Sequence, residues 1–591
     1  MADTNVADPP PTAEEKARMA QLEALEAIRQ EGNRTFAQGN WTGAIAKYSM
    51  CINLAGGKME VEHDMEKAQK DNVNSIANVA FNHLLALAYS NRAEARLRLH
   101  DYKEALDDAE KALEVDLHPK HVKTLVRKGK AAHGLELYSE ACEAFKAALK
   151  EFPGEKSILK LLKESTVAVE QSRKGDYELA EYFCRGCTDP VPVCADYVGP
   201  VGIRRANRSD GRGRGLFATR DLEPAELLIV NNPIAAGRQK CKKNVLYPDE
   251  EEGEGGFDII KKEFPEKLLS ELVEKLQKSK LQLVRFSSLA SDDIPSMELF
   301  KPETCRVPPN PVDEELDEEF IADIARKRMF HYVESNSCAR NRYPESTEIA
   351  GLWILPAFAN HSCAPTCQHN FVGKTIFFRA NQHIKEGDEL TVPYNSDIFE
   401  DVMSRKETLQ NWLFTCKCER CLVEEKLAPQ LRKISMEIEE KRRRHYLTVK
   451  EVGVTADDVL GGVEGELSNA ADEVEKMIQT SGKNLQPRQQ AWIRASYTAL
   501  YMSKVLVPNA ELEEFEMAVM AQSSVYITPS VLQLATQFLG AVEQYYPKES
   551  PTFQTTIQYV MRIYTLYFGK QPEAVLRILI NNNMPNHHRA I

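Results

Sequence analysis

The sequence predicts a multidomain α+β protein, with α-helical repeats at the N-terminus, a central β-rich domain and an α-helical domain at the C-terminus. A chain of 591 residues is too long for one hydrophobic core, so two to four domains are expected. A helical motif recurs in the first 170 residues, and short β-branched runs bounded by glycine and proline occupy residues 200–240. After Ala428 the apolar residues recur every three to four positions, which is typical of helices.

The N-terminal motif combines an aromatic residue with a small residue three positions later. Its copies are Trp41 with Ala44, Tyr102 with Ala105, and Tyr138 with Ala141. The last two copies lie 36 residues apart, close to the roughly 34-residue period of tetratricopeptide repeats, which this region resembles. The first two lie 61 residues apart, so we expect an insertion near residues 57–80. Residues 157–172 are expected to form a capping helix.

These patterns place the domain boundaries. We expect a tetratricopeptide repeat domain at 13–175, a linker at 176–199, a central domain at 200–425 with a helical insertion near 240–335, and a C-terminal helical domain at 430–591.

Five polar residues of the repeats form a candidate peptide site. They are Arg29, Asn33, Asn91, Lys123 and Arg127. Four-residue spacing puts two of the pairs on single helix faces, and all five side chains can donate hydrogen bonds. The set resembles the carboxylate clamp by which tetratricopeptide domains hold the acidic C-terminal tail of cytosolic heat-shock chaperones. That family usually has lysine at the place of Arg29. The alternative is that these residues are solvated helix faces.

The central region carries a cluster of potential metal ligands. Asn360-His361-Ser362-Cys363 follows an apolar run, and Cys416, Cys418 and Cys421 follow later with C-x-C-x2-C spacing. Four cysteines can close a tetrahedral zinc site with no open position, which is a structural rather than a catalytic arrangement. We therefore expect the Cys416–Cys421 segment to be pinned against the loop at Cys363.

Several separated motifs of this region resemble the SET domain of protein lysine methyltransferases, in particular the SET- and MYND-domain subgroup. They are Gly211–Ala218, Asn336-Ser337, Asn360–Cys363, Gly387–Tyr394 and Phe414–Cys421, in the order that the family has. The subgroup usually has asparagine at Thr366 and often tyrosine at Trp412. A MYND zinc finger is predicted to be absent, because Cys241 has no C-x2-C pair around it.

The resemblance implies S-adenosyl-L-methionine as the methyl donor and Zn²⁺ as the structural metal. The implied donor-binding residues are Arg212, Gly213, Arg214, Gly215, Asn336, Asn360, His361, Tyr394, Trp412 and Phe414. Glycine backbone allows close approach to a ligand, and the Arg212 guanidinium can pair with the donor's carboxylate. Asn360 and His361 suit an adenine edge, and Phe414 offers an aromatic face. Tyr394 is the expected catalytic residue, while Trp412 either narrows the lysine channel or simply packs.

Composition limits the other classes of function. The net charge of −13 argues against duplex nucleic acid as the main ligand. No apolar run approaches the roughly 20 residues of a membrane helix, and the first residues do not resemble a signal peptide. Thirteen scattered cysteines indicate the cytoplasm or nucleus, with free thiols expected at Cys184, Cys187 and Cys194 in preference to a second metal site. The basic run 441–444 is either a nuclear signal or, as we favour, a solvated helix face.

Two functions compete. The first is a protein-lysine N-methyltransferase that acts on a histone or non-histone substrate and is recruited to chaperones or other proteins through its repeats. The second is a chaperone adaptor whose catalytically weak SET domain serves as a scaffold. The presence of Tyr394, Asn360, His361 and the four cysteines favours the first, and Thr366 leaves room for the second.

Overall fold

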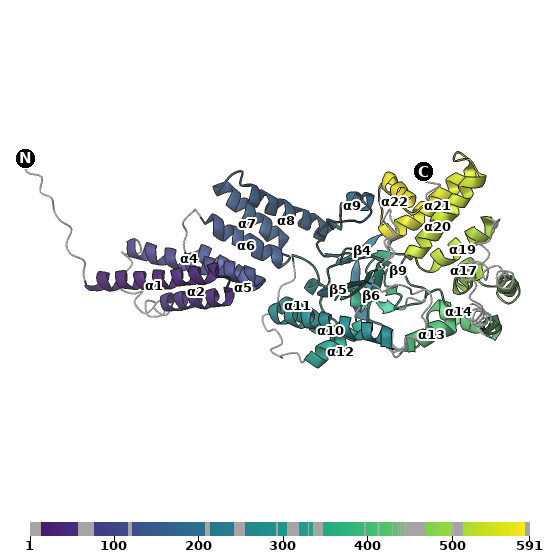
Figure 1. The fold of residues 1–591 in the computed structure, drawn as a ribbon, viewed down its shortest axis with the longest axis horizontal. Helices are drawn as coiled ribbons and strands as arrows, with labels where there is room; N and C mark the ends of the chain where they lie inside the picture. The colour runs from purple at the N-terminus through teal and green to yellow at the C-terminus, as the bar shows by residue number, and fades with distance from the viewer. Residues whose placement is uncertain are drawn as a thin grey trace, which may run out of the picture. The chain divides into compact units, whose positions relative to one another are not determined.

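The fold comes from a computed structural model. It describes residues 13–56, 76–115, 121–206, 213–240, 255–290, 293–303, 318–328, 330–334, 347–394, 398–410, 414–427, 429–434, 436–437, 440, 469–498, 500–501 and 512–584. The chain divides into two compact units, which are described separately. Unit 1 comprises Met1–Arg173 with Lys301–Arg306, and unit 2 comprises Lys174–Phe300 with Val307–Ile591. Helices come first, strands dominate the middle and helices return at the end, so the predicted fold class is confirmed (Figure 1).

Unit 1 is a stack of helical hairpins. Its helices are α1 (Ala13–Ala37), α2 (Trp41–Gly56), α4 (Ile76–Arg98), α5 (Tyr102–Val115), α6 (Val122–Gly134), α7 (Tyr138–Glu151) and α8 (Lys156–Lys174). The hairpins α1–α2, α4–α5 and α6–α7 pack in sequence, with α2 against α4 and α5 against α6. The first helices of the hairpins also contact one another, α1 with α4 and α4 with α6. Side chains on these three helices can therefore meet on one face of the stack.

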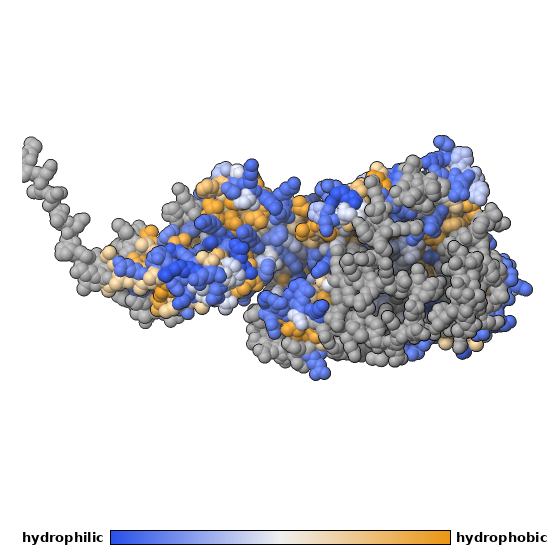
Figure 2. All heavy atoms as spheres, in the orientation of Figure 1, coloured by the Kyte–Doolittle hydropathy of each residue, from blue (hydrophilic) through white to orange (hydrophobic). Residues whose placement is uncertain are grey.

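Small residues permit this close packing. Ala44, Ala105 and Ala141 are fully buried between helices, as the motif predicts. A Cβ added to Gly129 on α6 would lie 2.5 Å from the Phe145 ring on α7, so only glycine fits there. On the face seen in Figure 2, hydrophilic side chains alternate with apolar patches over the repeat helices.

Unit 2 contains three small sheets. One has the order β1 (Tyr197–Val198), β4 (Leu227–Asn231), β10 (Thr375–Ala380), β9 (Cys367–Val372). The second has the order β2 (Val201–Arg205), β3 (Arg214–Ala218), β11 (Glu389–Val392), β8 (Asn360–His361). The third has the order β5 (Ala235–Lys240), β7 (Thr347–Leu352), β6 (Phe330–Glu334). All pairs are antiparallel except β8 with β11, which run parallel.

Helices between β5 and β6 complete the core beneath the sheets. They are α10 (Gly255–Lys278), α11 (Lys280–Ala290) and α12 (Glu318–Arg328). Leu268, Leu272, Phe286 and Ile321 from these helices join one buried cluster with strand residues such as Leu216.

The C-terminal helices share a second core with the first sheet. They are α13 (Val402–Gln410), α14 (Glu419–Lys426), α17 (Pro487–Ser496), α19 (Leu512–Val525), α20 (Pro529–Tyr545), α21 (Pro551–Phe568) and α22 (Glu573–Asn583). Helix α21 packs against β9 and β10, and Phe183 on the short helix α9 (Ala180–Cys184) meets Phe568 edge to face at 5.2 Å. Within the described ranges no helix combines the length and apolar character that crossing a membrane requires.

Candidate functional site

The parallel pairing of β8 with β11 assembles the centre of the site. Thr391 lies beside Asn360 and Val392 lies beside His361, so Tyr394 follows two residues after this pairing. Strand β3 pairs with the other edge of β11 and brings the glycine motif to the same place. Segments more than 140 residues apart thus converge, as the order of the motifs predicts.

Three rings form a cluster at this point. The His361 ring lies 5.5 Å from the Tyr394 ring and 5.7 Å from the Phe414 ring, measured between centroids. The Tyr394 and Phe414 rings are 6.2 Å apart and nearly perpendicular. The Tyr394 hydroxyl donates a hydrogen bond to the Ala359 carbonyl at 2.8 Å, which fixes the direction of the phenol.

Both nitrogens of His361 are engaged by the protein. Nδ1 accepts a hydrogen bond from the Tyr394 backbone N–H at 3.0 Å, and Nε2 lies 3.2 Å from Cys363 Sγ. The side chain is also buried. Any contact of His361 with an adenine edge would therefore use its backbone rather than its ring.

Asn360 locks the glycine motif to β11. Its Nδ2 donates to the Arg214 carbonyl at 3.0 Å and to Glu389 Oε1 at 2.6 Å. A Cβ on Gly215 would lie 2.6 Å from that Glu389 oxygen and 2.8 Å from Asn360 Nδ2, so a side chain there would break the lock. Sequence reasoning missed Glu389, although its place in the Gly387–Tyr394 motif was a signal. Gly213 has open space where a side chain would stand.

Arg214 is directed elsewhere. Its guanidinium donates to the carbonyls of Ser288, Asp293 and Leu289 at 2.7, 2.8 and 3.1 Å. The side chain therefore ties β3 to the end of α11, and only its backbone reaches Asn360. Three other expected donor-binding residues, Arg212, Asn336 and Trp412, lie outside the described residues.

Thr366, the departure from the resembled pattern, has a structural role. Its hydroxyl donates to the Glu389 carbonyl at 3.0 Å and accepts from the Thr391 N–H at 2.9 Å. Its own N–H donates to Thr391 Oγ1 at 3.1 Å. Thr366 thus holds β11 in place beside Asn360, and the substitution leaves no gap in the hydrogen bonding of this segment.

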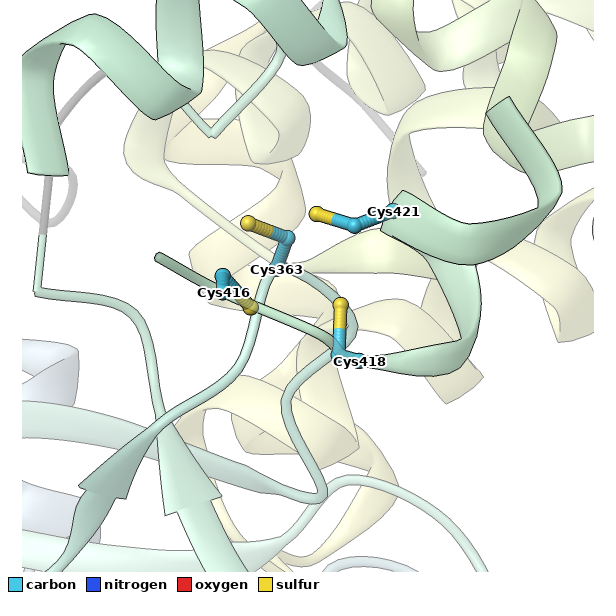
Figure 3. A group of neighbouring side chains, drawn as sticks. All are labelled: Cys363, Cys416, Cys418 and Cys421. Atoms are coloured by element: carbon cyan, nitrogen blue, oxygen red, sulfur yellow. The ribbon is translucent and has the colours of Figure 1, made fainter. Parts of the chain in front are cut away.

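The four cysteines converge on one point. Cys363 follows β8, Cys416 and Cys418 lie on an extended segment, and Cys421 lies on α14; their sulfur atoms all lie within 4.8 Å of one another (Figure 3). A tetrahedral zinc with Zn–S bonds of about 2.3 Å requires sulfur separations of about 3.8 Å, which small side-chain adjustments satisfy. The donor set is therefore compatible with zinc, and it is closed, with no position left for a substrate.

Two fully buried arginines surround this cluster. Arg405 lies 3.8 Å from Cys421 Sγ and 3.2 Å from Glu424 Oε2. Arg420 donates to Glu424 Oε1 at 2.9 Å and to the Cys363 carbonyl at 2.9 Å. Burial lowers the pKa of Arg405, but the charges of Glu424 and of the thiols outweigh this effect and raise it. Burial and repulsion from Arg405 lower the pKa of Arg420.

The arginines also reach α17. Arg420 Nη2 donates to Ser496 Oγ at 2.8 Å, and that hydroxyl donates to Glu424 Oε1 at 2.9 Å. Four thiolates around Zn²⁺ carry two negative charges, so two guanidiniums and one carboxylate compensate part of that charge in a site without water. The cysteine cluster is thereby connected to a C-terminal helix.

Four of the five expected clamp residues in unit 1 lie close to Tyr48. Asn33 Oδ1 accepts hydrogen bonds from the Tyr48 hydroxyl at 2.8 Å and from Asn91 Nδ2 at 3.1 Å. Arg127 Nη1 reaches Asn91 Oδ1 at 3.4 Å. Burial raises the pKa of Tyr48, and the charges of Arg127 and Arg29 oppose this, which places both guanidiniums near the phenol.

Acidic neighbours already pair with the clamp arginines. Glu26 forms two hydrogen bonds with Arg29, at 2.6 and 2.8 Å. Glu94 lies 3.2 Å from Arg127 Nε. Lys123, the fifth residue, is exposed on the same helix as Arg127.

One prediction on cysteines is wrong. Cys187 is disulfide-bonded, whereas a free thiol was expected; Cys184 and Cys194 are free. Spacing alone cannot reveal a bond to a distant part of the chain, because it depends on the tertiary fold. The basic run 441–444 and Cys241 lie outside the described residues.

Comparison with known families places the central region. Residues 213–395 match the SET domain family. The chain therefore contains a SET domain, the class of domain that its motifs predict, and helical hairpins of the tetratricopeptide kind precede it.

Individual relatives cover different parts of the chain. A protein named methyltransferase from Gibberella zeae is 24% identical over 410 residues, covering 67% of this chain and 51% of that protein. Mouse histone-lysine N-methyltransferase SMYD3 is 35% identical over 81 residues, covering 14% of this chain and 19% of that protein. Dynein axonemal assembly factor 4 of Pongo pygmaeus is 30% identical over 139 residues, covering 22% of this chain and 27% of that protein. The chain thus spans about half the length of the Gibberella relative and less of the others.

Solved structures match the repeats. The Arabidopsis OM64 TPR domain is 27% identical, with 25% of this chain and 98% of that chain covered and a TM-score of 0.20. The second TPR domain of human RPAP3, solved in complex with an HSP70 peptide, is 25% identical, with 25% of this chain and 98% of that chain covered and a TM-score of 0.19.

Proposed function

We propose that this chain is an S-adenosylmethionine-dependent protein-lysine N-methyltransferase, recruited to partner proteins by its repeats. The observation that carries this proposal is the convergence of Gly215, Asn360, Tyr394 and Phe414 inside the SET match, beside a four-cysteine cluster. Methyltransferases among the relatives support the reaction class. Substrate protein, methylation site and location in cytoplasm or nucleus remain predictions.

The donor, when bound, supplies a methyl group on a sulfonium sulfur. The open side of Gly213 leaves room for a ligand next to the backbone, and Asn360 and Glu389 hold this strand in register. The Phe414 ring offers a face for the adenine. Arg212 and Asn336 remain expected contacts. The cysteine cluster fixes Phe414, because Cys416 and Cys418 follow it directly.

Tyr394 would orient the attacking amine. A lysine near pKa 10.4 must lose its proton at pH 7, which costs roughly 4.6 kcal/mol before the site contributes. Burial in a channel and the positive sulfonium both lower the pKa of that lysine. The Tyr394 hydroxyl proton is committed to the Ala359 carbonyl, so its oxygen lone pairs can accept a hydrogen bond from the amine and align it with the methyl group.

Replacement of Tyr394 tests this role. Tyr394→Phe keeps the ring contacts and removes the hydroxyl, so methyl transfer from labelled donor should fall about 100-fold with little change in donor affinity. Tyr546→Phe, at an exposed position, is the matched control. Equal transfer by Tyr394→Phe and wild type would refute the assigned role.

Donor titration separates the enzyme from the scaffold alternative. Wild type should release heat on binding S-adenosylmethionine, and Asn360→Ala should bind at least tenfold more weakly because β3 loses its lock. Absence of binding by wild type would favour the scaffold. The hydrogen bonds of Thr366 weaken the case for that alternative, because they show that this departure costs the site no contact.

We also propose that unit 1 binds an acidic C-terminal peptide of a heat-shock chaperone. The support is the linked set Asn33, Asn91 and Arg127, which presents donors from three successive hairpins near one phenol. A terminal carboxylate can accept from several such donors at once. Lys123, exposed on α6, can add a further charge.

Peptide titration tests the clamp. A peptide ending in Glu-Glu-Val-Asp should bind wild type, and its C-terminally amidated form should bind at least tenfold more weakly. Lys123→Ala with Arg127→Ala should abolish binding, whereas Lys130→Ala, an exposed lysine of the same helix, should not change it. Equal binding by wild type and the double variant would exclude this site.

A further inference from the structure

His361 has a defined orientation and tautomer. The Tyr394 backbone N–H can only donate, so Nδ1 of His361, 3.0 Å away, must be the acceptor. In a neutral imidazole the proton then lies on Nε2. That atom is 3.2 Å from Cys363 Sγ, so it donates an N–H···S hydrogen bond to a cysteine of the cluster.

Packing holds the ring in this orientation. His361 is 2% exposed, Cys363 is fully buried, and the rings of Tyr394 and Phe414 lie within 6 Å of the imidazole. A ring flip would turn the protonated nitrogen toward another N–H and lose both hydrogen bonds. One imidazole therefore joins a cysteine Sγ to the backbone of the proposed catalytic residue.

We propose that His361 is a positioning residue that couples metal occupancy at the four-cysteine cluster to the backbone at Tyr394. A zinc-bound thiolate is fixed in space and is a good hydrogen-bond acceptor, so it holds Nε2 and, through the rigid ring, places Nδ1 to receive the Tyr394 N–H. The effect on methyl transfer rests on the proposed function. The link between the cluster and the Tyr394 amide does not depend on it.

Two isosteric variants divide the link. Asn places its side-chain oxygen near the position of Nδ1, so His361→Asn keeps an acceptor for Tyr394 and loses the donor to Cys363. Gln places its amide nitrogen near the position of Nε2, so His361→Gln keeps the donor to the thiolate and loses the acceptor. His383→Asn, at an exposed histidine, is the control.

The first measurement follows the metal. In zinc-loaded full-length protein, His361→Asn should release zinc to a chelator about tenfold faster than wild type, and the thiolate-to-metal charge-transfer band of the cobalt-substituted form should shift. His361→Gln and His383→Asn should resemble wild type in both. Unchanged release and an unchanged band in His361→Asn would overturn the hydrogen bond to Cys363.

The second measurement follows the Tyr394 amide by hydrogen exchange. Removal of zinc from wild type should speed its exchange at least tenfold, while β9 and β10 stay protected. His361→Gln should show the fast exchange with zinc still bound. A Tyr394 amide indifferent to both changes would overturn the coupling.

Activity then separates the two proposals. In an active enzyme, His361→Gln should lower kcat about tenfold with KM for the donor changed less than twofold, because the residue positions Tyr394 and does not bind the donor. Unchanged kcat in this variant would overturn the positioning role. A wild type that retains zinc and the exchange coupling but transfers no methyl group would refute the proposed function and leave the coupling standing.

Discussion

Replacing Arg420 by methionine tests whether the buried charges around the cysteine cluster hold unit 2 together. The guanidinium is fully buried and donates to Glu424, Ser496 and two backbone carbonyls, those of Cys363 and Ile398. Methionine fills much of the same volume without donors. The change therefore removes hydrogen bonds and charge with a small cavity term.

The magnitude follows from what is left behind. The carbonyls of Cys363 and Ile398 lose donors in the interior, and each stranded polar group costs about 1–3 kcal/mol. Glu424 keeps only the 3.2 Å contact with Arg405 as an ion pair. Removal of one partner from a buried ion pair costs about 3–5 kcal/mol, which sets the expected loss of stability for Arg420→Met.

The assay is urea denaturation of unit 2 followed by a local probe, because a protein of two units need not unfold in one step. Trp492 on α17 is buried beside the network, so its fluorescence reports the region directly. Lys417→Met, at an exposed position next to Cys416, is the matched control and should leave the transition unchanged.

A loss below about 1 kcal/mol would refute the reasoning, since it would mean that water or other groups satisfy the stranded carbonyls. Ser496→Ala sharpens the result. It should cost less than Arg420→Met alone, and the double variant should cost less than the sum, because both changes act on one network.

Further changes address other parts of the molecule. Gly215→Ala should weaken donor binding at least about tenfold in calorimetry, because its Cβ would lie 2.6 Å from Glu389 Oε1. Gly129→Ala should destabilise unit 1 by about 1–3 kcal/mol through overpacking, whereas Gly540→Ala, with no atom within 4 Å, should stabilise helix α20 by about 0.5–1 kcal/mol, both measured by denaturation. Burial raises the pKa of Asp101 from 3.8 to about 7, so the folded state retains a proton that the unfolded chain releases. Stability of unit 1 should therefore fall as pH rises from about 4 to about 7, and Asp101→Asn should flatten that slope in a denaturation series.

The sequence was sufficient for features that depend on spacing. The helical repeats, the order of the SET motifs and the four-cysteine set all have short local signatures, and the structure places Cys363 with Cys416, Cys418 and Cys421. The aromatic and small residues of the repeats behaved as expected because helix periodicity fixes which side chains face a neighbour.

Features that depend on long-range approach were not accessible. Nothing near Arg214 in the sequence indicates that its guanidinium would reach carbonyls about 75 residues later. The buried pair of Arg405 with Glu424 looked like ordinary surface charge, because burial of an ion pair is decided by the packing of α13, α14 and α17. His361 was read as a ligand contact, since its two nitrogens acquire partners only when β8 lies beside β11.

The position of the cysteines along the chain has a practical consequence. The SET match ends at residue 395, yet three of the four sulfurs and Phe414 come after it. A recombinant fragment trimmed to residues 213–395 would strand Cys363 as a solitary thiol and leave Tyr394 without one of its ring neighbours. Ser496 extends the same dependence to α17. Fragments intended for crystallography or screening should therefore run well past Cys421, and a negative result from a shorter piece would say nothing about the intact polypeptide.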